Sequence, residues 1–330
     1  MFKLAAKVFP IAFLAATSFS AIAQSVTAHI MLPNFTTGGV AVNAVTNKIY
    51  AVSNSGSSDV NDTVSVIDGK TDSLVTEISV PSGAYLPAVN ILTNEIYVAS
   101  CNSLLNPAPC FVTVINGKTN KVVTSIPVTT VLNGFLTGIA VDPLTCTIYV
   151  SDNTNGDIAI ISARTNAVTG TVSLPGENPW GIALNPFTNQ LYVTLGSNAI
   201  DIIDLKTHQI AQTSIGENAS GFNVALDPLT GHVFVTNTQA GYSTVAVLDQ
   251  AGKVLAQVPV GEAAFGIDAD PFARLVVTAN TNDNTSSVFS SKTNVPTATI
   301  AGTDALFLSI NPVSHKIYAI GNGMVSVATE

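Results

Sequence analysis

The stretch "DPLTCTIYVSD", residues 142–152, decides the fold because close relatives of it recur along the chain. Further copies are "NPFTNQLYVT" from residue 185, "DPLTGHVFVTN" from 227 and "NPVSHKIYAI" from 311. An Asn or Asp followed by Pro is typical of the start of a type I turn, and the apolar run after it is typical of a strand. The chain therefore repeats a turn and a strand as one unit.

Seven copies of this unit are found when the sequence is aligned on the Asn or Asp that opens each of them. We call these residues the anchors, and they are Asn43, Asn90, Asp142, Asn185, Asp227, Asp270 and Asn311. Pro follows five of them, and they are separated by 47, 52, 43, 42, 43 and 41 residues. A period of roughly 40 to 50 residues is typical of the blades of a β-propeller. The anchors therefore predict seven blades.

Each repeat contains the pattern of four strands and no helical periodicity. A short apolar segment such as residues 138–141 precedes the anchor, and a strand with one aromatic residue at a fixed position follows it in six copies, Val277 being the exception. Two more strands follow, as in residues 63–80, where "DGKTD" forms the turn between them. Apolar residues occupy both faces of these strands. Sheets that cover each other around an axis explain how 47% hydrophobic residues are accommodated with only 10% charged ones.

The two ends of the chain are expected to share the last blade. Residues 315–330 leave no room for a fourth strand, whereas residues 25–33, "SVTAHIMLP", resemble fourth strands such as 168–175. Pairing these segments leaves no open edge in the ring. We therefore predict an all-β fold: one domain, residues 24–330, forming a seven-bladed β-propeller of four-stranded antiparallel blades, with the last blade closed by the mature N-terminal strand.

The N-terminal segment, residues 1–23, has the features of an export signal. Two lysines precede an apolar run that ends in "AIA", the small residues that a signal peptidase requires. The alternative is a membrane anchor, but this run is interrupted by Pro10 and is shorter than the roughly 20 residues that a span needs. We expect cleavage after residue 23 and a periplasmic or secreted protein with no transmembrane segment in the mature chain.

The mature chain is acidic. Removing the two lysines of the export signal leaves ten basic residues against 21 acidic ones, a net charge near −11. The basic residues are scattered along the sequence, which disfavours a polyphosphate partner. We therefore do not expect nucleic acid as a partner, and we expect a monomer.

Three cysteines occur in the chain. Cys101 and Cys110 bracket "NSLLNPAP" and can close this loop in an oxidising compartment, while Cys146 lies in a different turn. We predict a Cys101–Cys110 disulfide with Cys146 free. Two reduced, buried thiols are the alternative.

The repeated "IYVxN"-like core and tails such as "KTNKVVTSIPV", residues 118–128, resemble the YVTN-repeat β-propellers. This family includes YncE-like periplasmic proteins and surface-layer proteins of archaea, and the resemblance covers residues 24–330. It implies the propeller fold but no single activity, because the matching residues are turn and core residues. Some YncE-like proteins bind DNA, which the acidity of this chain argues against.

Four aromatic residues are expected at one mouth of the central channel. The fifth residue before each anchor lies at the start of the inner strand, and in four repeats it is aromatic: Tyr85, Trp180, Phe222 and Phe265. Such a ring is either a stacking platform for a sugar, a peptide or another flat ligand, or a plug that keeps water out of the channel.

Asp268 departs from the repeat. The residue two before the anchor is Ala in five repeats but Asp268 and Ser309 in the last two. A carboxylate near the axis can bind a cation or a ligand, and function is expected where a repeat breaks its own pattern. The alternative is a carboxylate whose partners are neighbouring backbone N–H groups or water.

Long loops are concentrated in the first repeats, at residues 55–63, 100–110 and 129–137. Long loops on a rigid scaffold commonly recognise partners. We therefore predict an off-centre docking site near Tyr85, Leu104, Leu105 and Phe135. Drift in loop length without functional cause is the alternative.

Catalytic and metal signals are weak. The four histidines form no convergent cluster, and "GKT" at 69–71 and 117–119 lacks the glycine that a phosphate-binding loop needs five residues earlier. Residues 152–157 and 280–287 are rich enough in oxygen for calcium, but polar hairpin links have the same composition. We predict no cofactor and no metal ligand set, with calcium as a lesser possibility.

Three functions are compatible with this pattern. The leading interpretation is an exported, non-catalytic module that binds an envelope or extracellular protein or a glycan on the loop-rich face. An alternative is a metal-assisted lactonase- or lyase-like enzyme that uses Asp268 with Asn223. A structural component of a surface layer is the third.

Overall fold

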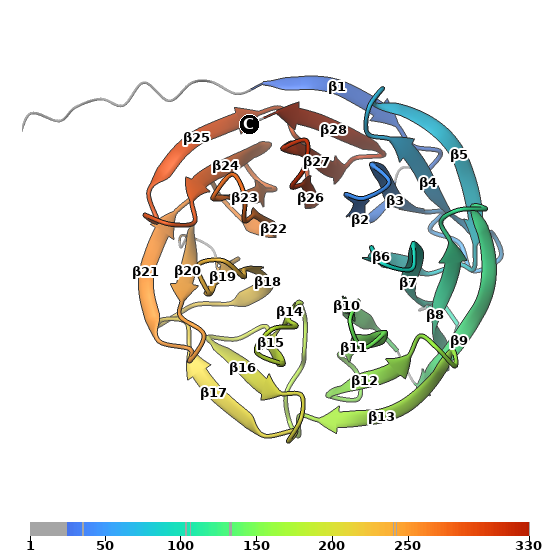
Figure 1. Ribbon diagram of the computed structural model, residues 1–330, viewed down its shortest axis with the longest axis horizontal. Coiled ribbons are helices and arrows are strands. Elements are labelled where there is room, and N and C mark those ends of the chain that lie inside the picture. The colour runs from blue at the N-terminus through green and yellow to red at the C-terminus, as the bar shows by residue number, and fades with distance from the viewer. Residues whose placement is uncertain are drawn as a thin grey trace, which may run out of the picture.

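Seven four-stranded antiparallel sheets surround a central axis, so the predicted fold is confirmed (Figure 1). The computed structural model describes residues 25–34, 36–102, 104–105, 107–131, 134–239, 241 and 243–329. The predicted export signal, residues 1–23, lies outside the described residues. Within the described ranges the chain forms strands and turns, and no helix that could cross a bilayer is present there.

The first four blades follow one another along the chain. Blade 1 contains β2 (Thr36–Asn43), β3 (Lys48–Asn54), β4 (Asp62–Asp68) and β5 (Ser73–Val80). Blade 2 contains β6 (Ala84–Asn90), β7 (Glu95–Cys101), β8 (Ala108–Asn116) and β9 (Lys121–Val131). Blade 3 contains β10 (Leu136–Asp142), β11 (Thr147–Asp152), β12 (Asp157–Ser162) and β13 (Ala167–Ser173). Blade 4 contains β14 (Ile182–Asn185), β15 (Gln190–Thr194), β16 (Ala199–Asp204) and β17 (Ile210–Ser214).

The remaining blades complete the ring, and the last one combines both ends of the chain. Blade 5 contains β18 (Gly221–Asp227), β19 (His232–Asn237), β20 (Thr244–Leu248) and β21 (Val254–Pro259). Blade 6 contains β22 (Ala264–Asp270), β23 (Leu275–Asn280), β24 (Thr285–Ser290) and β25 (Pro296–Ala301). Blade 7 contains β26 (Phe307–Asn311), β27 (Lys316–Gly321), β28 (Met324–Thr329) and β1 (Val26–Met31).

The anchors fix the turn between the first and second strand of every blade. All seven anchor side chains are buried. In each, Oδ1 accepts the backbone N–H groups of the residues two and three positions later, at 2.8 to 3.4 Å. A buried acceptor that satisfies two N–H groups makes the turn independent of water, so it can be enclosed between blades.

The second atom of the anchor side chain can reach the next blade. Asn43 Nδ2 donates to Asn94 Oδ1 at 2.8 Å, and Asn311 Nδ2 donates to Asn47 Oδ1 at the same distance. Asp270 Oδ2 pairs with His315 Nδ1 at 2.7 Å. Asn47, Asn94 and His315 occupy the same place in their turns, four residues after the anchor, where φ is positive. One repeated residue therefore holds its own turn and also links neighbouring blades.

The hydrophobic core is divided into seven clusters that lie between neighbouring blades. In one of them Tyr50, Val52 and Val66 of blade 1 pack on Ile96 and Ile115 of blade 2. The second and third strands are buried along nearly their whole length, as the pattern iBBBBBi of β3 illustrates. Each sheet thus contributes both faces to the core, which explains the continuous apolar runs in the sequence.

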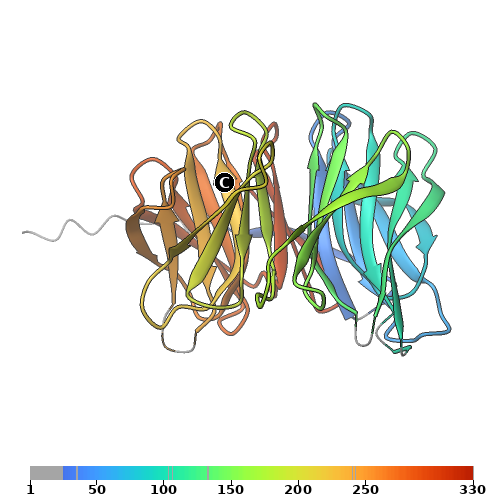
Figure 2. The same ribbon diagram turned by 90° about the horizontal axis from the view of Figure 1, so that it is seen from below.

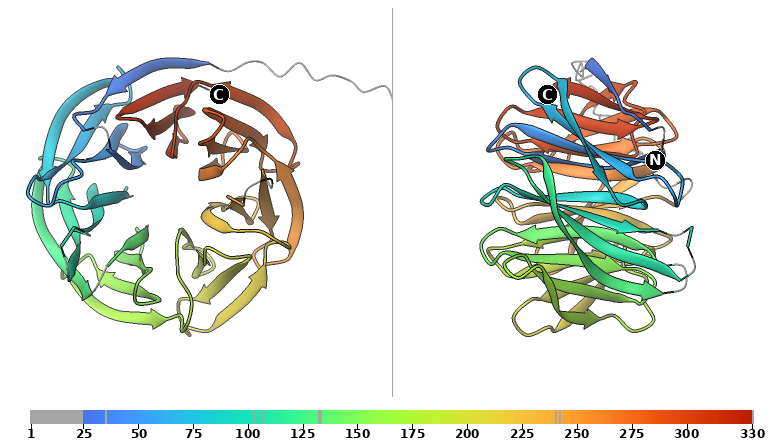
Figure 3. Two further views of the ribbon diagram at one scale, coloured as in Figure 1. Left: turned by 180° about the vertical axis from the view of Figure 1, so that it is seen from behind. Right: turned by 90° about the vertical axis from the view of Figure 1, so that its right-hand side faces the viewer.

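The ring is closed by β1, as predicted, since β1 pairs antiparallel with β28. Figure 3 shows the blue N-terminal strand beside the red C-terminal strands. Thr27 Oγ1 donates to Val327 O at 3.1 Å, across 300 residues of sequence. The seam between blades 7 and 1 is further held by Lys316 Nζ, which lies 2.7 Å from Asp72 Oδ2 and donates to Gly69 O at 3.0 Å.

The disc has two faces, and each carries its own set of turns and loops (Figure 2). We call the side that carries the anchor turns and the turns between third and fourth strands the turn face. The opposite side, which we call the loop face, carries the loops between second and third strands and those between blades. The start of every inner strand lies at the loop face.

Substitution of Cys146 by Asn is expected to stabilise the fold. Cys146 is four residues after its anchor, with φ of 59°, where Asn47 and Asn94 accept a hydrogen bond from the preceding blade. The corresponding donor, Asn90 Nδ2, is buried without a partner. Cys146→Asn supplies the acceptor and a residue that tolerates this φ, so the free energy of unfolding should rise by about 1–2 kcal/mol in denaturant titrations. Cys146→Ala, the control, should give no gain, and an equal gain from both variants would contradict the explanation.

Candidate binding site on the loop face

Six aromatic side chains form a closed circle around the axis at the loop face. The order is Tyr85, Phe135, Trp180, Phe222, Phe265 and Phe307, and the last contacts the first. We call this set the aromatic circle. Neighbouring ring centroids lie 4.0 to 6.0 Å apart, with interplanar angles from 38° to 82°. Such tilted and edge-to-face pairs are the arrangements that aromatic side chains prefer.

The aromatic circle is packed on itself. Because each ring contacts two neighbours, little ring surface is left to stack on a ligand inside the channel. Phe307 is buried, whereas the other five members are partly exposed. This geometry fits the plug better than the stacking platform. The five partly exposed members leave some apolar surface at the centre of the loop face.

Sequence alignment on the anchors missed two members of the circle. Phe265 lies five residues before its anchor in β22, which has an irregular register between Ala264 and Ile267. No irregularity interrupts β26, so Phe307 reaches the same level one residue closer to its anchor. Phe135 precedes β10 and had been assigned to the docking site alone. Leu306 and Thr137 are the residues five positions before the anchors of these two blades. Neither belongs to the circle, and Thr137 is buried, with Oγ1 donating to Pro179 O at 2.7 Å.

Hydroxyl groups of the second strands position the circle. Thr194 Oγ1 donates to the carbonyl oxygen of Phe222 at 2.8 Å, and Thr236 Oγ1 donates to that of Phe265 at 3.2 Å. Each bond links a blade to the aromatic residue of the next blade. The backbone of the circle is therefore fixed by the same blade-to-blade contacts that hold the ring together.

A cavity of about 270 Å³ lies on the axis next to the aromatic circle. The inner strands of all seven blades line it, and its polar lining includes Asp268, Ser309, Asn223 and Thr137. Phe307 belongs both to this lining and to the circle. The structure therefore places Asp268 and Asn223, the residues of the alternative enzyme, around one axial cavity.

The Asp268 carboxylate is already engaged by protein donors. Its Oδ2 accepts Ile310 N at 2.8 Å and Ser309 Oγ at 3.2 Å, and its Oδ1 accepts Ala269 N at 2.8 Å. The two residues that break the alanine pattern are thus hydrogen-bond partners, and they join β22 to β26. Burial raises the pKa of this carboxyl to about 6, although the three hydrogen bonds act in the opposite direction.

Off the axis, a pocket of about 180 Å³ opens between the long loops of blades 1 and 2. Tyr85, Leu104, Phe135 and Cys101 line it, together with Asn54, Gly56, Ser57, Gly83 and Asn102. The structure therefore brings together three of the four residues predicted for the docking site. Leu105 is next to Leu104, and both are exposed, by 45% and 63%.

The walls of this pocket are held by buried polar groups. Asp62 is fully buried and accepts Ser55 N at 2.7 Å and Ala84 N at 2.8 Å, so it ties the loop of blade 1 to β6. Asn102 Nδ2 donates to Ser82 Oγ at 2.8 Å. The structure contains the Cys101–Cys110 disulfide at the base of the second loop, and Cys146 is free. The loops are therefore fixed at their bases, and their tips present Leu104, Leu105 and Val60 to solvent.

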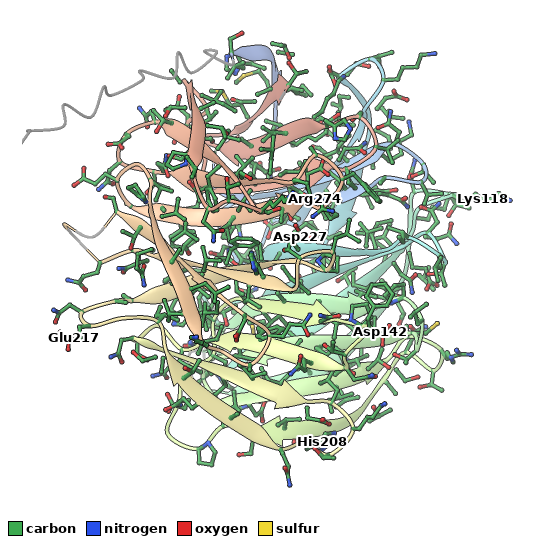
Figure 4. The ribbon with its side chains drawn as sticks, turned by 60° about the vertical axis from the view of Figure 1, so that its left-hand side comes forward. Lys118, Asp142, His208, Glu217, Asp227 and Arg274 are labelled. Atoms are coloured by element: carbon green, nitrogen blue, oxygen red, sulfur yellow. A yellow bond between two sulfur atoms is a disulfide. The ribbon has the colours of Figure 1, made fainter. Side chains whose placement is uncertain are left out.

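Charge is divided between the two faces. All basic residues of the described chain lie at the turn face: Lys48, Lys70, Lys118, Lys121, Arg164, Lys206, Lys253, Arg274, Lys292 and Lys316. The loop face carries nine acids: Asp59, Asp62, Asp152, Asp157, Glu177, Glu217, Glu262, Asp283 and Asp304. Figure 4 shows Glu217 at one side of the disc and Lys118 at the other. The basic residues are scattered along the sequence, but in the structure they share one face of the disc.

The candidate calcium segments show turn-like bonding. Asp152 and Asp157 are cross-strand neighbours, and burial followed by the Asp152 carboxylate raises the pKa of Asp157 to about 6. In 280–287, Asn280 Nδ2 donates to Thr285 Oγ1 and Ser287 Oγ. Within the described ranges, no group of three or more His, Cys, Asp or Glu side chains is placed to hold a metal. The expectation of no cofactor, with calcium as the lesser possibility, stays a prediction.

A scan against protein-family models and a search of curated proteins gave no match to this chain. The fold and the two faces define the class of protein: it is a seven-bladed β-propeller with an acidic loop face.

Asp268 is expected to make the stability of the protein depend on pH. Because its pKa of about 6 is above the ordinary value of 3.8, folding penalises the charged form. Stability is highest below pH 4 for this group and falls as the pH rises through 6. The free energy of unfolding of Asp268→Asn, minus that of the native chain, should therefore rise by up to about 3 kcal/mol from pH 4 to pH 8. The histidines are common to both proteins, so their titration cancels in this difference. The same difference in the free energy of unfolding at pH 4 and at pH 8 would contradict the raised pKa of Asp268.

Proposed function

We propose that this protein is an exported, non-catalytic interaction module that holds a protein or glycan ligand on its loop face. The observation that carries the proposal is the pocket between the loops of blades 1 and 2, where Tyr85, Leu104 and Phe135 converge. Its walls are fixed by Asp62 and by the disulfide, so an incoming ligand meets a preformed site. Preformed sites of this kind lose little conformational entropy on binding.

The apolar surface near the pocket supports a contact larger than the pocket itself. Leu104, Leu105 and Val60 are exposed around it, and the partly exposed edges of the aromatic circle continue the apolar surface toward the axis. Aromatic and aliphatic anchors in a central patch with a polar rim are typical of binding interfaces.

The charge of the loop face restricts the class of ligand. Nine acids, of which Asp62 and Asp152 are buried, and no basic residue of the described chain lie there, so an anionic ligand is repelled and a neutral or cationic one is favoured. A neutral glycan or a basic protein segment fits this surface. Nucleic acid does not fit the loop face, whatever the arrangement of lysines on the opposite side.

The enzyme alternative is supported less well by the geometry at Asp268. Both carboxylate oxygens accept hydrogen bonds, and the donors are backbone N–H groups and Ser309. A group with these partners acts chiefly as a link between β22 and β26. Phe307 of the aromatic circle also lines the axial cavity, so the circle lies next to the space that Asp268 faces.

Export and family membership are parts of the same proposal. The lysines, apolar run and small residues of the first 23 positions support export, and a disulfide suits an oxidising compartment. The repeated "IYVxN"-like core supports a place among the YVTN-repeat propellers of periplasmic or surface-layer type.

Removal of the apolar loop tip is expected to abolish ligand capture. Leu104→Ser/Leu105→Ser changes two exposed side chains, so the fold should be unaffected while affinity for the captured partner falls at least about tenfold, or about 1.4 kcal/mol. The measurement is cross-linking and pull-down from an envelope fraction, with the bound partner then purified and titrated. The matched control, Phe187→Ser/Phe272→Ser, changes two exposed residues on the turn face and should bind as the native chain does. Equal binding by all three proteins would contradict the proposal.

Cleavage of the N-terminal segment is expected after residue 23. Protein recovered from the periplasm or the culture medium should begin with Gln24 when its N-terminus is sequenced, and Cys101 and Cys110 should resist alkylation before reduction. Recovery of the uncleaved chain in the cytoplasm would refute export without affecting the binding test.

A further inference from the structure

The turn face carries a ring of exposed hydrophobic side chains. In every blade, the residue two positions after the anchor is a large apolar residue that is 56% to 74% exposed: Val45, Leu92, Leu144, Phe187, Leu229, Phe272 and Val313. We call this set the apolar ring. The anchor Oδ1 bonds the backbone N–H of each of these residues, which fixes the turn and directs the side chain away from the core. The fold does not require an exposed apolar side chain at this position, yet all seven blades have one.

A second apolar set surrounds the disc at the same end. The fourth strands of blades 1 to 6 begin with exposed apolar residues: Leu74, Val75, Val122, Val123, Val168, Ile210, Val254, Leu255 and Val295. We call this set the rim belt. In blades 1, 2 and 5, a register shift in the pairing of third and fourth strands adds one residue to the fourth strand, namely Val75, Val123 and Leu255. These bulges place two successive apolar side chains outward.

The exposed hydrophobic surface is thus concentrated at one end of the molecule. Of the 21 exposed large hydrophobic residues in the described chain, 17 belong to the apolar ring, its neighbour Ile91 and the rim belt. Monomeric soluble proteins seldom expose contiguous apolar surface on this scale, and such surfaces commonly mark sites of interaction.

Basic residues accompany this apolar surface. Eight exposed cations lie at the turn face: Lys70, Lys118, Lys121, Arg164, Lys206, Lys253, Arg274 and Lys292. The acids of the same face are less accessible. Asp68 and Asp72 pair with Lys48 and Lys316, and the anchor aspartates are buried. Glu95, Asp204 and Asp249 are partly exposed at the same face, so the most exposed charged side chains there are positive, with acids between them.

We propose that the turn face docks on the surface of an anionic phospholipid bilayer. The apolar ring and rim belt enter the region between headgroups and acyl chains, and the eight exposed cations contact lipid phosphates. This combination of apolar and cationic side chains is the one that interfacial membrane binding requires. The proposal does not depend on the ligand proposed for the loop face, which would point away from the membrane.

The position of the rim belt distinguishes a bilayer from a protein partner. A flat partner that covers the apolar ring leaves the sides of the disc in water, whereas a fluid medium into which the end sinks covers both. The rim belt begins two to three residues beyond the turns, within about 10 Å at roughly 3.3 Å per strand residue. This depth matches the roughly 5–10 Å that apolar faces penetrate at an interface.

Two other occupants fit the observations less well. A second copy stacked with its loop face on this turn face would match the charges but would leave the rim belt uncovered. A nucleic acid would satisfy the lysines, but its phosphates gain nothing from the 17 apolar side chains. Both are outcomes of the experiment below.

The test is flotation of the mature protein with vesicles of phosphatidylcholine alone or of equal parts phosphatidylcholine and phosphatidylglycerol. The native chain should float with the mixed vesicles, bind the neutral ones weakly and be released at about 1 M salt, where screening acts within about 3 Å. Phe187→Ser/Phe272→Ser should lower partitioning at least about tenfold, and Lys118→Glu/Lys206→Glu should lower it for the mixed vesicles alone. Unchanged melting temperatures show that these variants are folded.

The matched control is Leu104→Ser/Leu105→Ser, which should float like the native chain. Failure of the native chain to float, or an equal loss in the loop-face control, would overturn the proposal. It would also be overturned by self-association in sedimentation velocity, or by duplex DNA binding, that Phe187→Ser/Phe272→Ser abolishes. Loss of vesicle binding with retained ligand capture separates this proposal from the one for the loop face.

Discussion

The structure depends on one constraint: each sheet is apolar on both faces, so no blade can exist with either face in water. Every hydrophobic cluster is consequently shared by two blades, as between Tyr50 of blade 1 and Ile96 of blade 2. A linear stack would leave two end faces exposed, and closure into a ring removes both. The anchors make this packing specific, because a buried Asn or Asp satisfies its own turn and can bond the adjacent blade. Where that second bond fails, as at Asn90, the donor is left buried and unpaired.

The number of blades, the four strands in each blade and the closure by residues 25–33 could be predicted from the sequence, because each follows from a repeated local pattern. The site was less predictable. Four members of the aromatic circle share one register, but Phe307 reaches it from a strand without the irregularity found in β22. Bulges depend on pairing between strands and leave no mark in the spacing of one segment. The partnership of Asp268 and Ser309 likewise required the neighbouring blade to be in place.

The distribution of charge was missed for a related reason. Lysines and arginines at separations of tens of residues look dispersed, yet each lies at a turn or at the adjacent strand end, and the alternation of strand direction brings all of these to one face. Nine acids lie at the opposite face, where no lysine or arginine of the described chain is found, while other acids share the turn face with the basic residues. The net negative charge is a property of the whole chain, and it does not reveal that the two faces carry different charged groups.

The closing strand has a consequence for the order of folding. β1 is the first strand of the described chain and its partner β28 is the last, so the contact between Thr27 and Val327 cannot form until Val327 has been synthesised. Until then, six blades can assemble beside one another while the seventh lacks its outer edge. The entropic cost of joining such distant segments grows only logarithmically with their separation. Closure of the ring therefore requires β28. A chain that lacks β28 keeps most of its blades, but β1 has no strand to pair with and the ring stays open.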